Sequence, residues 1–333
     1  MALKIDQAKL TITSSRAQGD RARKVNMQGI KTISKSRPWQ RFVLILLVLV
    51  MANGCATANS YKRPVARFEN GVKQTADTVE PYFTRINWID SQNRLLDKAC
   101  EGQNWNINDL TPRFDPETIQ ARVKALQVIR KYARLLADIA GSEAPGTYMA
   151  AAAELRGNSQ ALLDEVGGLI KKKNMPDIRE PLTGLMTFLG EIVIEHQRKQ
   201  ALDSAIKAGE EPVKELIRLL REDTIATTLL WRQYLIHRQI IMFKMYNKER
   251  QKAASLEDLT KKVLSDNQEV EALSTFQVGK LFDDLSKAHE ALVEFANSEG
   301  KRADLASLTE QIEVFTEHAQ TVFDLVQSFR NIK

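Results

Sequence analysis

Apolar residues spaced alternately three and four positions apart constrain this chain more than any other feature. The pattern is most regular near the carboxyl end, where two stripes flank the turn-forming segment 297–300. The two stripes comprise Val278, Leu281, Leu285, Ala288, Leu292 and Phe295, then Leu305, Leu308, Ile312, Phe315, Ala319, Val322, Val326 and Phe329. Because this spacing keeps apolar side chains on one helix face, it predicts a coiled-coil-like helical hairpin within residues 271–333.

The same spacing recurs upstream, while the sequence has no sustained period-two alternation of the kind that marks strands. An upstream stripe contains Val65, Phe68, Val72, Thr75, Val79, Tyr82, Ile86, Ile89, Asn93, Leu96 and Cys100. Pro81 lies inside this stripe, so we expect the helix to kink or divide there. The sequence therefore predicts an all-α fold, an elongated antiparallel helical bundle with long helices over residues 65–333.

Local signals predict where individual helices begin and end. Asp-Pro-Glu at 115–117 combines a capping residue, a proline at the first helical position and an acid in the first turn. Glu-Glu-Pro at 210–212 predicts the start of a second long helix that ends near residue 253. A shorter helix is expected from Ser255 to Asp-Asn at 266–267.

Residues 229–246 are apolar nearly all round the predicted helix, which is typical of a helix at the centre of a bundle. They also contain the aromatic and basic cluster Trp231, Arg232, Tyr234, His237 and Arg238. Such a cluster could line a ligand pocket. Residues of these types at helical spacing more commonly form core and a solvated edge, and we favour that interpretation.

A second informative feature lies near the amino end. Arg37 and Arg41 precede an apolar run at residues 42–52, which is shorter than the ~20 residues of an ordinary transmembrane helix. The run leads into Ala52-Asn53-Gly54-Cys55. A basic flank, a short apolar core and small residues before a cut are the pattern of a secretory signal peptide. A single-pass anchor with a chance cysteine is the alternative.

With Cys55 at the first mature position, residues 37–57 resemble a bacterial lipoprotein precursor. The resemblance implies that residues 1–54 are a leader, cut after Gly54, and that the Cys55 thiol and the new amine carry acyl chains such as palmitate. Two or more acyl chains anchor a protein stably in a membrane, whereas one does not. Residues 55–64 would then be a lipidated tether.

The resemblance also implies a location. Ala56 follows the cysteine, where an Asp would retain a Gram-negative lipoprotein at the inner membrane, so we expect the outer membrane, facing the periplasm. Met27 would give a leader of more usual length, and we expect residues 1–26 to be a start-site artefact.

The net charge of +6 does not indicate nucleic-acid binding. Residues 1–54 contain ten Lys or Arg and two acids, which leaves 38 basic and 40 acidic residues in the remainder. After processing, Cys100 is the one remaining thiol, so no internal disulfide can form. We expect it to be a small buried side chain, and pairing with a cysteine of another molecule is the alternative.

The four histidines do not form a recognisable metal motif. His196 lies near Glu191 and Glu195, but without the Glu-x-x-His spacing of di-iron bundles. His289 and His318 lie on opposite arms of the predicted hairpin at ~10 Å, too far apart to share a metal ion. We expect His318 to lie off the apolar stripe as a surface residue, and we predict no metal, cofactor or catalytic site.

These features together favour a membrane-anchored, non-catalytic envelope scaffold or protein-interaction module in the periplasm. Its partners would be membrane lipid, through acylated Cys55, and an envelope protein. The alternative is a binding module that holds a small molecule, lipid or metal among its helices. An enzyme is the third hypothesis, which convergent titratable groups in a deep cleft would support.

Overall fold

The computed structural model describes the backbone of the chain in seven segments, with most of their side chains from residue 60 onward. The segments are residues 38–141, 145–169, 176–189, 198–249, 253–275, 278–298 and 302–330. The chain divides into two compact units, residues 1–49 and 50–333. In the first unit the described part, residues 38–49, belongs to a helix that continues into the second.

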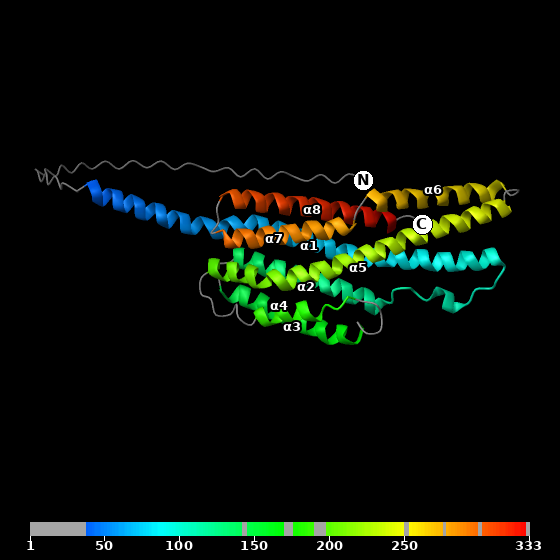
Figure 1. Cartoon of the computed structure of the whole chain (residues 1–333), viewed down its shortest axis with the longest axis horizontal. Coiled ribbons are helices and arrows are strands. Elements are labelled where there is room, and N and C mark those ends of the chain that lie inside the picture. Colours follow the sequence, from blue (N-terminus) through cyan, green and yellow to red (C-terminus); the bar gives the residue numbers. More distant parts are fainter. Residues whose placement is uncertain are drawn as a thin grey trace, which may run out of the picture. The chain divides into compact units, whose positions relative to one another are not determined.

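The protein is an all-α helical bundle, and no strand occurs in the segments given above. Figure 1 shows the helices in chain order. They are α1 (Pro38–Glu101), the short 3-10 helix η1 (Ile107–Leu110), α2 (Pro116–Gly141), α3 (Pro145–Leu169), α4 (Arg179–Leu189), α5 (Arg198–Glu249), α6 (Ala253–Thr275), α7 (Val278–Asn297) and α8 (Arg302–Arg330).

Helix α1 is longer than the sequence predicted. Residues 55–64, expected as a tether, are helical, and Tyr61 is buried where its hydroxyl donates to Asp203 Oδ1 at 2.9 Å. The helix is not divided at Pro81. A proline removes one backbone N–H from a helix, but the next residue, Tyr82, is fixed by α5, since its hydroxyl lies 2.8 Å from Thr228 Oγ1.

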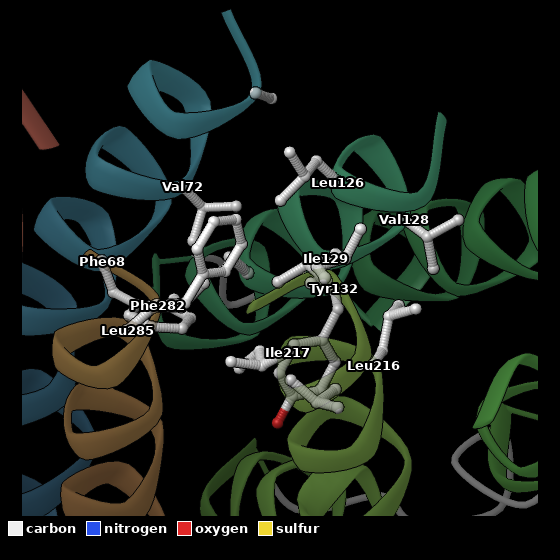
Figure 2. Packing of buried hydrophobic residues seen from close by; sticks show 14 of the residues in the cluster. Phe68, Val72, Leu126, Val128, Ile129, Tyr132, Leu216, Ile217, Phe282 and Leu285 are labelled. Carbon is white, nitrogen blue, oxygen red and sulfur yellow. The ribbon is translucent and has the colours of Figure 1, made fainter. Parts of the chain in front are cut away.

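The main core forms where α1, α2, α5 and α7 meet. Figure 2 shows this region, with side chains from all four helices packed together. The labelled residues are Phe68, Val72, Leu126, Val128, Ile129, Tyr132, Leu216, Ile217, Phe282 and Leu285. All of them are buried, so the apolar stripe of α1 faces this core as its spacing predicted. Burial of large apolar side chains is the dominant favourable contribution to folding.

The predicted terminal hairpin is confirmed. Helices α7 and α8 pack against each other, and nearly every residue of both stripes is buried, with Leu305 half-buried. Phe315 at the centre of α8 also contacts α1, since its ring lies 6.0 Å from that of Phe68 and against the backbone of Gly71. A Cβ atom on residue 71 would come within 2.5 Å of the Phe315 ring. The hairpin therefore packs on α1 as well as on itself.

The helix start at 115–117 is also confirmed. Asp115 Oδ1 accepts a hydrogen bond from the Thr118 N–H at 2.9 Å, as an N-cap residue does, and α2 runs from Pro116 to Gly141.

The predicted break at 210–212 is wrong, because α5 runs through it without interruption. Two close contacts explain why a glycine and a proline occur in this part of the helix. Tyr132 packs against Gly209, where a Cβ atom would meet its ring at 2.6 Å, and Pro212 packs against Gly184 of α4. Gly209 and Pro212 therefore serve helix packing, and packing overrides the local signal for a helix start.

The predicted end at 266–267 is wrong for a similar reason. Helix α6 continues to Thr275, and Asp266 is a fully buried residue that faces Arg238 of α5. An Asp in the interior of a helix has poor intrinsic propensity. Here its tertiary role as an ion-pair partner decides the structure.

Candidate interaction surface

The predicted lipidation residue, Cys55, lies within α1, in a stretch whose side chains are outside the described residues. Its acylation and the leader therefore stay predictions. No described helix combines the length and the apolarity that a bilayer span requires.

The structure separates the histidines. His196 lies outside the described residues. His237 Nε2 lies 2.7 Å from Asp97 Oδ2 on an exposed edge, and His289 is buried with its Nε2 3.2 Å from the Tyr132 hydroxyl. Burial lowers the pKa of His289 to about 4, so its imidazole is neutral at pH 7.

The expectation that His318 is a surface residue is wrong. It is largely buried, and its Nδ1 lies 2.8 Å from Oδ2 of Asp284, a buried carboxylate on α7 that the sequence analysis did not single out. Within the described residues, no group of three or more His, Cys, Asp or Glu side chains could hold a metal ion. Cys100 is a half-buried free thiol rather than a core residue.

The aromatic and basic cluster of residues 231–238 does not converge on one pocket. Trp231 and Arg238 contact Glu269 and Asp266 of α6 and also pack against aromatic rings of α1, whereas Tyr234 and His237 contact Asp90 and Asp97 of α1. Trp231, Tyr234 and Arg238 are spaced three and four positions apart and so share one face of α5, but their side chains reach different partners there.

Trp231 and Arg238 belong to a buried network of charged and aromatic groups between α1, α5 and α6. Arg85 of α1 binds Glu269 of α6 through two parallel hydrogen bonds, Nε to Oε1 at 3.1 Å and Nη2 to Oε2 at 2.7 Å. Trp231 Nε1 donates to the same Oε1 at 2.9 Å. A bidentate pair with a third donor satisfies a buried carboxylate well.

The second pair in the network is less well satisfied. Arg238 Nη2 forms an ion pair with Asp266 Oδ1 at 2.8 Å, but both carboxylate oxygens and the guanidinium Nε and Nη1 are buried without a hydrogen-bond partner among the described residues. Desolvation raises the pKa of Asp266 to about 6, which Arg238 partly opposes. Trp88 connects the pairs, since the Arg85 and Arg238 guanidinium carbons lie 4.5 and 4.9 Å from its ring centroid.

Above this network, the outer face of α5 is apolar and exposed. Leu229, Ile236, Ile240 and Phe243 have exposed fractions between 45% and 65%. The prediction that residues 229–246 are central to the bundle is therefore wrong, because this face of the helix is left uncovered. A row of large apolar residues on one face is a sign of an interaction site, whereas single exposed apolar residues are ordinary.

A cleft of about 700 Å³ opens on another part of the surface, along α1, α2 and α8. Its walls mix apolar and charged groups: Ala76, Asp77, Glu80, Pro81, Thr84, Arg85, Trp88, Val123, Gln127, Arg130, Phe323 and Gln327. The volume is within the range of small-molecule sites. Arg85 and Trp88 connect the cleft to the buried network.

No protein-family model, no curated protein and no solved structure matches this chain. Its surfaces are therefore interpreted from their own residues.

Proposed function

We propose that this chain is a membrane-anchored envelope scaffold that binds a partner protein on the outer face of α5. The observation that carries the proposal is the exposed row Leu229, Ile236, Ile240 and Phe243 on a helix whose opposite side contacts α6. Trp231 and Arg238 fix the opposite side of the same helix segment, so the row is presented on an ordered element. Ordered apolar rows of this kind favour protein recognition.

The anchoring part of the proposal rests on the signal-peptide pattern that ends at Cys55. Acylated Cys55 would hold the protein on the outer membrane, facing the periplasm, while the described helices remain available to a partner. Fractionation tests this part. Cys55→Ser should leave the protein unprocessed or release it from the membrane fraction, and an unacylated wild-type chain would contradict the anchor.

Site-specific photo-crosslinking in the native envelope tests the partner surface. A photoreactive residue at Ile240 should form a discrete crosslinked species, whereas the same residue at Thr321, exposed on α8, should not. Equal crosslinking at both positions, or none at Ile240, would contradict the proposed surface.

The cleft favours a second candidate function, a binding module for a small molecule. Asp77, Glu80 and Arg130 lie at its walls and have no ion-pair partner within the described residues, while Val123 and Phe323 supply apolar surface. Native mass spectrometry of the purified chain would reveal a retained ligand. Thr84→Trp, which fills the cleft from an exposed position, should then abolish retention.

A further inference from the structure

The exposed row on α5 has the register of a coiled-coil seam. Six residues follow the alternating spacing of four and three without a skip, and all six are exposed: Leu229, Gln233, Ile236, Ile240, Phe243 and Asn247. Apolar residues occupy four of these positions. This register is the one by which a helix packs against another helix.

The seam points away from the bundle. At 100° per residue, Leu229, Ile236, Ile240 and Phe243 lie within about 60° of the helix circumference, on the side opposite Arg238. A lipid-facing or core-facing helix usually carries an apolar face at least about 100° wide, whereas a helix–helix seam is narrower. The width therefore favours a helical partner over a membrane surface.

The charges beside the seam are of one sign. Residues 224–248 contain no Asp or Glu, and Arg232 and Lys244 occupy the flanking positions of the heptad on either side of the row. Lys248 follows one turn later. His237, also beside the row, contacts Asp97 of α1 at 2.7 Å, so that acid is already engaged.

This charge pattern disfavours occupants with basic flanks. A second copy would bring no Asp or Glu to the seam, because residues 224–248 contain none, and would add two more cations beside it, Arg232 and Lys244. Residues 1–54 of the chain, with ten basic and two acidic residues, would be repelled for the same reason.

We propose that the outer face of α5 pairs, in coiled-coil fashion, with a helix that presents apolar a and d positions flanked by Asp and Glu. The inference rests on the proposed function, because the acidic helix would be part of the partner protein that the scaffold binds. It names the chemistry by which that partner is recognised: an apolar seam for affinity and acidic e and g positions for selectivity.

The test uses the full-length chain in detergent and two three-heptad peptides, labelled for fluorescence anisotropy. Both have Leu at a and d; one has Glu and the other Lys at every e and g position. The Glu peptide should bind at least about tenfold more tightly than the Lys peptide. Ile236→Ser with Ile240→Ser should abolish binding, although the chain keeps all its charges.

Charge-reversal variants test the electrostatic part of the inference more directly. Arg232→Glu with Lys244→Glu should invert the preference between the two peptides, whereas Lys262→Glu with Lys287→Glu, two exposed positions elsewhere, should leave it unchanged. Circular dichroism of each variant verifies that the helices remain folded.

Three results would overturn the inference. They are equal binding of the two peptides, self-association of the chain that is lost in the Ile236 and Ile240 variant, and binding to phosphatidylglycerol vesicles that is lost in that variant. Failure of Cys55→Ser to alter membrane attachment would instead contradict the anchor and leave the peptide result intact, so the two proposals fail separately.

Discussion

Two heptad seams of similar regularity, one on α8 and one on α5, differ in whether they are buried. The seam of α8 is buried against α7 and α1, whereas the seam on the outer face of α5 is exposed along four turns. Both patterns predict helix pairing. Heptad spacing therefore predicts that a helix packs against another helix. It does not tell whether that second helix belongs to the same chain. The α8 seam is part of the core, whereas the α5 seam is exposed.

The largest expected effect separates the two seams by stability. Phe315→Ala removes a fully buried ring from contact with Phe68 and Gly71 and should lower the free energy of unfolding by about 3–5 kcal/mol. Chemical denaturation followed by circular dichroism would measure it. A silent Phe315→Ala would mean that the α8 seam is not a core at all.

The two regions should also respond oppositely to pH. His289, in the hairpin, has its pKa lowered from 6.5 to about 4 by burial, so the unfolded state binds more protons between these values. Its contribution to stability therefore rises with pH across that window, by up to about 3 kcal/mol. Asp266, beneath the α5 seam, has its pKa raised from 3.8 to about 6, so its contribution falls as pH rises between those values.

Substitution isolates each slope. His289→Asn removes a contribution that increases with pH, so between pH 4 and 6.5 its free energy of unfolding should rise less than that of wild type, or fall more steeply. Asp266→Asn removes a contribution that decreases with pH, so between pH 4 and 6 its free energy of unfolding should rise more steeply than that of wild type. Denaturation curves at several pH values would measure both. Parallel curves for wild type and both variants would show that neither group titrates abnormally.

A smaller effect is expected at His318. Its substitution by Ala leaves Asp284 buried without its imidazole partner, which should destabilise the protein by about 1–3 kcal/mol. His237→Ala, at an exposed contact with Asp97, is the matched control and should change stability by less than about 1 kcal/mol. Equal losses in thermal melts would contradict the assigned burial.

The smallest expected effect belongs to the exposed seam. Ile240→Ser should change the free energy of unfolding by less than about 0.5 kcal/mol, as surface substitutions usually do. Thermal melts would measure it beside the crosslinking experiment. A loss of several kcal/mol would mean that Ile240 is a core residue, and the contrast between the two seams would disappear.

The sequence predicted the helical class, the terminal hairpin and the cap at Asp115, because each depends on spacing or on neighbours in the chain. It did not predict that α5 continues through residues 210–212, since Tyr132 and α4 approach from far along the sequence. The buried pairs Arg85–Glu269 and Asp284–His318 were missed for the same reason. Their charged residues look like solvated positions until the partner helix is known.

The exposure of the α5 seam was the most consequential miss. An apolar circumference indicates that a helix segment is covered on all sides, but not by what. Asp266 and Glu269 on α6 account for one side of residues 229–246, and α1 accounts for part of another. Nothing in the spacing of apolar residues tells a side covered within the chain from one left open to a partner.

The position of α1 at the amino end affects how the protein folds. Its core contacts join residues far apart in the chain, such as Thr316 with the Arg67 carbonyl, which are 249 positions apart. Contacts of such long range form slowly, since a large loop must close first. During synthesis, the part of α1 that contacts α8, such as Phe68, therefore stays incompletely covered until α8 has been made. Complete burial of this part of α1 is therefore one of the last steps in folding.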